Sequence, residues 1–172
     1  MEVLRSVFTN NRYTGIFAIG AGTELTLSDV LVGYTLSRQS DGKGGIGLSI
    51  KEGATVEVSR TVFTNNREIG VFAADSGTEL SLSDVVVGYT LSKLSDGNFG
   101  RGLTIESGAS VEVSRSVFTN NRERGVVAFN EGTKLTMSDI LISHTLERQC
   151  ATDEREEHQP RCNSQCCRIS FL

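Results

Sequence analysis

The chain has 172 residues, a formal net charge of −4 and 22% charged residues, with 18 glycines, one proline and no tryptophan. A chain of this length favours one domain with a core of its own. Its 17 basic residues are outnumbered by 21 acidic ones and form no basic run, which excludes a nucleic-acid binder that works by neutralising phosphates. No apolar run approaches the ~20 residues of a membrane helix, and residues 1–30 lack the layout of a signal peptide.

The sequence repeats with a period of 55 residues, because Val56-Glu57-Val58-Ser59-Arg60 recurs as Val111-Glu112-Val113-Ser114-Arg115. Residues 1–5 are a third, imperfect copy. Each unit divides into a short and a long turn, since equivalent glycines are separated alternately by 31 and 24 residues. These glycines are Gly22, Gly53, Gly77, Gly108 and Gly132. About five to six such turns, called rungs below, are predicted.

Within one rung, three short strands are predicted, for example over 56–58, 61–63 and 71–74. Val56 and Val58 alternate with Glu57, which is a strand period, and asparagine and glycine suit the corners between strands. A rung of this kind cannot bury its own inner face, so rungs must stack with parallel strands about 4.8 Å apart. The predicted fold over residues 1–147 is therefore an all-β parallel β-helix. Leucine-rich repeats do not fit either rung length.

The segments VEVSRTVFTNNREIGVFA and GTELSLSDVVVGYTLS resemble rungs of the right-handed parallel β-helix proteins of the pectin-lyase-like superfamily. This resemblance covers residues 1–147 and implies a right-handed solenoid in a secreted or cell-envelope protein. Enzymes of that superfamily tend to cluster acids or bases on one strand face. The corresponding third strands contain no carboxylate, and they are predicted at 16–19, 46–50, 71–74, 101–105 and 126–129. A glycosidase needs two neighbouring carboxyl groups, so we expect no catalytic residue, cofactor or metal site in the repeats.

Stacking turns equivalent positions into columns along the helix axis. One column, at the corner after the first strand, alternates strictly in sign: Arg5, Asp29, Arg60, Asp84, Arg115 and Asp139. Charges in neighbouring rungs can pair, and a one-rung slip would bring like charges together. We predict that this ladder is structural.

A second column is aliphatic, and consists of Val7, Leu31, Val62, Val86, Val117 and Leu141. Because neighbours in a strand face opposite sides, the column faces outward if Phe8, Phe63 and Phe118 fill the core. Three alternatives remain for this column. A loop or the tail covers it, another chain contacts it laterally, or a bent strand turns it into the interior.

Paired asparagines follow the second strand in the short rungs, at 10–11, 65–66 and 120–121. Satisfying the backbone of the corner is their predicted role, and hydrogen bonding to a sugar is the alternative. In the long rungs, glycine-rich loops occupy residues 40–47 and 95–102. Their spacing is not a nucleotide fingerprint, and one carboxylate per loop is too few for Ca²⁺. Loops on a rigid scaffold carry ligand contacts, so the candidate ligand-binding residues are Asp41, Lys43, Asp96, Asn98 and Arg101.

Residues 148–172 form a polar loop or tail that holds every cysteine and ends in a strand-like segment. Cys150, Cys162, Cys166 and Cys167 are disulfide candidates in an oxidising compartment, with no pairing readable from the sequence. A zinc site that includes His158, or free thiols, are the alternatives.

The predicted function is that of a non-catalytic segment of an extracellular or cell-envelope protein, whose loops bind a partner such as carbohydrate. The alternative is a fragment of a polysaccharide lyase or glycoside hydrolase without its catalytic rungs. Met1 falls at the position of Val56 inside a rung, so we expect a longer parent β-helix. The expected partners are a polysaccharide or another chain along the aliphatic column, with no nucleic acid and no membrane span.

Overall fold

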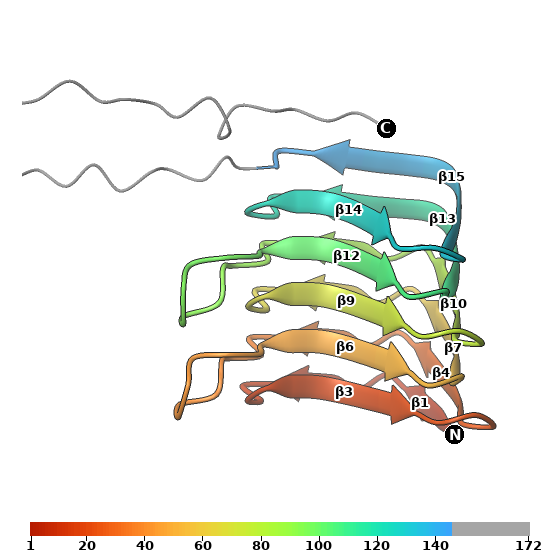
Figure 1. Ribbon diagram of the computed structural model, residues 1–172, viewed down its shortest axis with the longest axis horizontal. Coiled ribbons are helices and arrows are strands. Elements are labelled where there is room, and N and C mark those ends of the chain that lie inside the picture. Colours follow the sequence, from red (N-terminus) through yellow and green to blue (C-terminus); the bar gives the residue numbers. More distant parts are fainter. Residues whose placement is uncertain (146–172) are drawn as a thin grey trace, which may run out of the picture.

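The computed structural model describes residues 1–145, which form fifteen β-strands and no helix (Figure 1). Most rungs have three strands. The first strands are β1 (Glu2–Leu4), β4 (Glu24–Ser28), β7 (Thr55–Ser59) and β10 (Glu79–Ser83). The second strands are β2 (Val7–Thr9), β5 (Leu31–Gly33), β8 (Val62–Thr64) and β11 (Val86–Gly88). The third strands are β3 (Thr14–Ile19), β6 (Ile46–Lys51), β9 (Ile69–Ala74), β12 (Arg101–Glu106) and β14 (Arg124–Phe129).

Every described ladder is parallel, and each strand pairs with its counterpart one rung away. Val56 of β7 stands opposite Leu25 of β4 on one side and Leu80 of β10 on the other. The third strands form a separate five-stranded sheet in the order β14-β12-β9-β6-β3. The stack therefore has five three-sided rungs and two sides of a sixth, as the repeat predicts. Residues 1–145 contain no helix with the length and apolarity that a membrane crossing requires.

The last two rungs differ from the prediction of three separate strands. There the first two strands run together as β13 (Ser110–Thr119) and β15 (Lys134–Ser143), which pair along nearly their whole length. The corner persists inside both, because Arg115 and Asp139 have φ values of 45° and 55°. The bend is thus kept while the ladder of hydrogen bonds continues through it.

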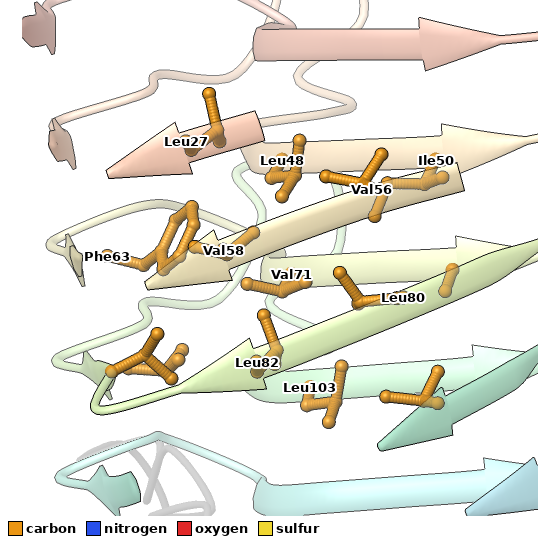
Figure 2. Close-up of a cluster of buried hydrophobic side chains, with 14 of the residues drawn as sticks. Leu27, Leu48, Ile50, Val56, Val58, Phe63, Val71, Leu80, Leu82 and Leu103 are labelled. Carbon is orange, nitrogen blue, oxygen red and sulfur yellow. The ribbon is translucent and has the colours of Figure 1, made fainter. Parts of the chain in front are cut away.

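The core lies between the sheets and is made by the inward residues of each strand. Val56, Val58, Phe63 and Val71 all point into it from one rung, between matching residues of the rungs above and below (Figure 2). Phe63 is fully buried, whereas its neighbour Val62 is 36% exposed. Burial of such side chains is worth about 1.5–3 kcal/mol each, and each rung adds several. Stacking is therefore the main source of stability, as in other solenoids.

The buried asparagines hold neighbouring rungs together at the second corner. The side chain of Asn66 donates from Nδ2 to Val32 O at 3.2 Å and accepts at Oδ1 from the Thr35 N–H at 3.1 Å. Asn121 repeats both bonds with Val87 and Thr90. These contacts confirm the predicted role in satisfying corner backbone for Asn66 and Asn121.

A column of glycines makes room for this arrangement. A Cβ on Gly47 would lie 2.5 Å from the Gly70 carbonyl oxygen and 2.7 Å from Asn66 Nδ2. Gly102 meets Gly125 and Asn121 in the same way. Glycine is needed here because the rungs approach closely.

Candidate binding surface

The charged column forms two ion pairs in the same direction along the stack. Arg60 donates from Nε to Asp29 Oδ1 at 2.8 Å and from Nη2 to Asp29 Oδ2 at 2.9 Å. Arg115 and Asp84 form the matching bidentate pair, at 2.9 and 2.7 Å. Each arginine therefore binds the aspartate of the preceding rung, across 31 residues of sequence.

Arg60 lowers the pKa of Asp29 below its usual 3.8, first through the hydrogen bond and further through the positive charge. Arg115 lowers the pKa of Asp84 for the same reasons. Both carboxylates thus stay ionised at neutral pH. The column is exposed, so its contribution to stability is screened by solvent.

The second strands present the aliphatic column on the outer surface. Val7, Leu31, Val62, Val86 and Leu141 are exposed, and Val117 is partly exposed. The idea that a partner chain covers this column stays a prediction.

The outer face of the third strands is mostly apolar or hydroxylated. Phe17, Ile19 and Phe129 are exposed on it, and Phe72 is nearly buried beneath Lys51, whose Nζ lies 4.9 Å from the ring centroid. The carboxylate Glu106 ends one strand, and its equivalents in the neighbouring rungs are Ala74 and Phe129. This face therefore does not bring two carboxyl groups together.

A shallow hollow of about 300 Å³ lies on the outer face of β4, β7 and β10. Its lining is hydroxylic apart from Val58 and one carboxylate, Glu57, and comprises Thr26, Glu57, Val58, Ser59, Ser81 and Ser83. A single carboxylate does not provide the acid and base pair of a glycosidase.

The first predicted ligand loop, between β5 and β6, is closed by its own polar side chains. Asp41 accepts from Arg38 Nε and Nη2 at 3.1 and 2.9 Å, and from the Lys43 N–H at 3.1 Å. The backbone hydrogen bond from Lys43 and the Arg38 guanidinium lower the pKa of Asp41 although desolvation opposes the shift. Asp41 therefore shapes the loop, while the Lys43 side chain is left exposed.

The second loop, between β11 and β12, follows the same plan. Asp96 accepts from the Asn98 N–H at 2.8 Å and pairs with Lys93 Nζ at 3.2 Å. Desolvation opposes a shift there, but the hydrogen bonds from Asn98 and Lys93 outweigh it and lower the pKa of Asp96. Arg101 forms a bidentate pair with Glu123, with both distances 3.1 Å, and lies 4.5 Å from the Phe99 ring centroid.

The two loops meet on one side of the stack, where both extend toward the N-terminal rungs (Figure 1). The Ser95 N–H donates to the Gly42 carbonyl at 3.1 Å, which links the tip of one loop to the other. Glu68 accepts from the Gly44 N–H at 2.7 Å and anchors the first loop to the next short rung. The predicted ligand-binding residues of the two loops thus lie on one continuous edge. The hydrogen bonds and ion pairs described for them are all with other residues of this chain.

We call this side the loop edge, meaning the segments that join second to third strands together with the first residue of each third strand. Within residues 1–145 it carries eight basic side chains, Arg12, Arg38, Lys43, Arg67, Lys93, Arg101, Arg122 and Arg124. Four acidic side chains oppose them, Asp41, Glu68, Asp96 and Glu123. The result is a surplus of four positive charges in a chain whose net charge is −4.

The opposite edge, where third strands lead into the next first strands, has the reverse balance. Its acidic residues are Glu24, Glu52, Asp75, Glu79, Glu106 and Glu131, against Lys51 and Lys134. The charges are therefore segregated across the width of the β-helix. The sequence shows no basic run because the arginines gather only when the rungs stack.

The loop edge also carries a mixed column of asparagine and tyrosine that was not predicted. Directly after each second strand stands a residue with positive φ. It is asparagine in the three short rungs, tyrosine in the first two long rungs and His144 in the third. Tyr34 and Tyr89 have φ values of 54° and 55°, and are 52% and 54% exposed. The 55-residue period could have revealed this alternation, had the corner positions been aligned.

No group of three or more potential metal ligands is present in the part of the chain that the structure describes. The cysteine candidates Cys150, Cys162, Cys166 and Cys167, and His158, lie outside the described residues.

The architecture is that of a right-handed parallel β-helix. Among solved structures, the chain is similar to the crystal structure of pectate lyase Pel9A, with a TM-score of 0.65 and 15% sequence identity. The match covers 81% of this chain and 44% of that chain, so this chain spans less than half the length of that enzyme. No protein-family model and no curated protein sequence matches the chain. The likeness confirms the predicted fold.

Proposed function

We propose that this β-helix binds an acidic polysaccharide along its loop edge without cleaving it. The observation that carries the proposal is the segregation of charge, with a positive loop edge opposite a negative one. Such an edge attracts a polyanion while the rest of the molecule repels it. The two loops on this edge are held by internal hydrogen bonds, so little order has to be gained on binding.

The choice of a saccharide draws support from the likeness in fold. The neighbour is described as a pectate lyase, and pectate is an acidic polysaccharide. Exposed tyrosines, and asparagines that are exposed or partly exposed, supply on the same edge the stacking and hydrogen-bonding groups that sugars use.

We propose no cleavage because neither the outer face of the third strands nor the hollow over β4, β7 and β10 brings two carboxyl groups together. The direction of the pKa shifts agrees with this. Within residues 1–145, four aspartates have displaced pKa values, and all four pKa values are lowered: Asp29, Asp41, Asp84 and Asp96. Downward shifts suit ion-pair partners, whereas a general acid needs a raised pKa.

The alternative of an incomplete polysaccharide lyase or hydrolase is favoured by the partial coverage of Pel9A. Whether the chain is a non-catalytic binder or part of an enzyme, we propose that it lies outside the cell or in the cell envelope. Release of shortened chains from the polymer would decide for the alternative.

Affinity electrophoresis in gels that contain polygalacturonate or a neutral β-glucan tests the proposal. We expect retardation by the acidic polymer only. Lys43→Glu should reduce it, whereas Lys134→Glu, the same change of charge on the opposite edge, should leave it unchanged. Equal retardation in both gels, or equal effects of the two variants, would overturn the proposal.

A further inference from the structure

The loop edge carries arginines that are oriented by the backbone. Arg12 donates from Nη1 to the Ser37 carbonyl at 3.1 Å, and Arg67 donates from Nη1 to the Ser92 carbonyl at the same distance. Each guanidinium is thus fixed against the rung that follows it. One of its five N–H donors is used in that bond, which leaves others to bind an anion. Arg12 is exposed and Arg67 is partly exposed.

These arginines alternate with leucines along the axis. Isolated bridges place Arg12 beside Leu36 and Arg67 beside Leu91, and the Arg67 N–H donates to Thr35 O of the intervening rung. Arg12 and Arg67 are therefore two rungs apart, roughly 9.6 Å at ~4.8 Å per rung. Arg122 stands at the next equivalent position.

The two exposed tyrosines occupy the rungs between the arginines. Tyr34 lies two residues before Leu36, and Tyr89 two residues before Leu91, so each ring belongs to a long rung flanked by arginines of the short rungs. The tyrosines are again two rungs apart. Counted rung by rung along the axis, the edge thus presents a cation, an aromatic ring, a cation and an aromatic ring, with one repeat per two rungs. The rings form a second column, two residues nearer the second strands than the column of Arg12, Leu36, Arg67 and Leu91.

The backbone at the tyrosines is strained for a bulky side chain. Asn10, Asn65 and Asn120 have φ values of 53–58° at the same corner of the short rungs, and asparagine tolerates this conformation far better than tyrosine. The half-exposed rings contribute little to the core, so a surface role accounts for them better than packing does.

We propose that these two neighbouring columns, with Arg12 and Arg67 in one and Tyr34 and Tyr89 in the other, bind an extended polysaccharide in which acidic and neutral sugars alternate. This inference rests on the proposed function and specifies its site and ligand class. The repeat of two rungs is close to the length of two β-linked sugars in an extended chain. A carboxylate on every second sugar meets an arginine fork, and the apolar face of each intervening sugar stacks on a tyrosine. The polymer runs parallel to the helix axis.

Hyaluronan oligosaccharides, in which uronate and N-acetylhexosamine alternate, are the probe, measured by calorimetry with wild-type protein and two double variants. Tyr34→Asn/Tyr89→Asn installs the residue that the short rungs already use, so the fold is retained while both rings are lost. We expect its affinity to fall about tenfold or more. Arg12→Gln/Arg67→Gln should weaken binding and flatten its dependence on salt, while Arg12→Lys/Arg67→Lys should restore part of both.

Oligosaccharide length gives a second readout. A disaccharide reaches one arginine and one ring, whereas a tetrasaccharide spans both repeats, so the affinity should rise steeply between these two lengths. Thermal unfolding of each variant, measured beside binding, separates a lost contact from a lost fold.

The outcomes distinguish the inference from the function on which it rests. If the wild-type protein binds acidic polysaccharides and every folded double variant binds them equally well, this site is wrong and the proposed function stands. Tighter binding to polygalacturonate than to hyaluronan would overturn the alternating ligand. If a single-stranded DNA of equal charge binds as tightly as hyaluronan, the protein recognises negative charge and not the sugar, which would overturn the saccharide ligand. No binding of any acidic polysaccharide would overturn both.

Discussion

Asn66 and Asn11 occupy equivalent positions in two short rungs, so the same substitution can be made at both and the losses of stability compared. Asn66→Ala removes an amide that is fully buried and bonded to the rung before it, at Val32 and Thr35. Asn11→Ala removes the equivalent amide in the first rung, which is only partly buried. The side chain of Asn11 forms no hydrogen bond within residues 1–145.

The expected cost at Asn66 follows from the groups left behind. The Val32 carbonyl and the Thr35 N–H both belong to fully buried residues, and each unsatisfied buried group costs about 1–3 kcal/mol. Because water can enter the space and relieve part of this, we expect a loss of about 2–4 kcal/mol. At ~2–4 °C per kcal/mol, the Tm should fall by roughly 5–15 °C. Asn11→Ala should stay within about 0.5 kcal/mol of the parent.

Urea unfolding followed by circular dichroism measures both variants, with Asn121→Ala as an independent repeat of the large effect. Losses at Asn66 and Asn11 that agree within error would refute the assignment of rung-to-rung hydrogen bonds to the buried asparagines.

Three further substitutions test the stack. Because the pKa of Asp84 is lowered in the folded state, its ion pair contributes to the stability of the fold above about pH 4, and this contribution is lost as the pH falls through the folded-state pKa. Asp84→Asn should therefore lower the Tm at pH 6 but not at strongly acidic pH. A difference in Tm that does not depend on pH would contradict this. Phe63→Ala should cost about 3–5 kcal/mol and Val62→Asp far less, and equal damage in denaturant unfolding would show that the faces are wrongly assigned. Gly47→Ala should destabilise by about 1–3 kcal/mol because its Cβ has no space, and a Tm equal to that of the parent would exclude the close approach.

The fold could be predicted because a repeat imposes its own register. Once Val56 and Val111 are recognised as equivalent, alternation within the strand fixes which side chains face inward, and stacking is the one way to bury them. The outward position of Val62 and the buried position of Phe63 follow from the same alternation.

The direction of the ion pairs could not be predicted in this way. Arg60 has an aspartate one rung away on both sides, and alternation of charge treats Asp29 and Asp84 alike. The structure pairs it with Asp29, because the side chain leaves a left-handed corner, with φ of 45°, toward the preceding rung. Side-chain direction at a corner depends on backbone geometry that a sequence pattern does not contain.

The position of the tyrosine column beside the arginine column could not be predicted, for a related reason. Tyr34 and Arg67 are 33 residues apart in sequence and belong to different positions of the repeat. They share one edge because a corner turns both outward, with the buried position of Thr35 and Asn66 between them. A strand period of two, applied to straight strands, does not describe a corner.

Binding without cleavage is tested by size-exclusion chromatography with light scattering on a mixture of the protein and a long acidic polysaccharide. We predict that the protein elutes with the polymer at low salt, dissociates as the salt is raised, and leaves the mass of the polymer unchanged after prolonged incubation. Protein that elutes alone at every salt concentration would contradict binding, and a polymer that becomes shorter would contradict a non-catalytic role.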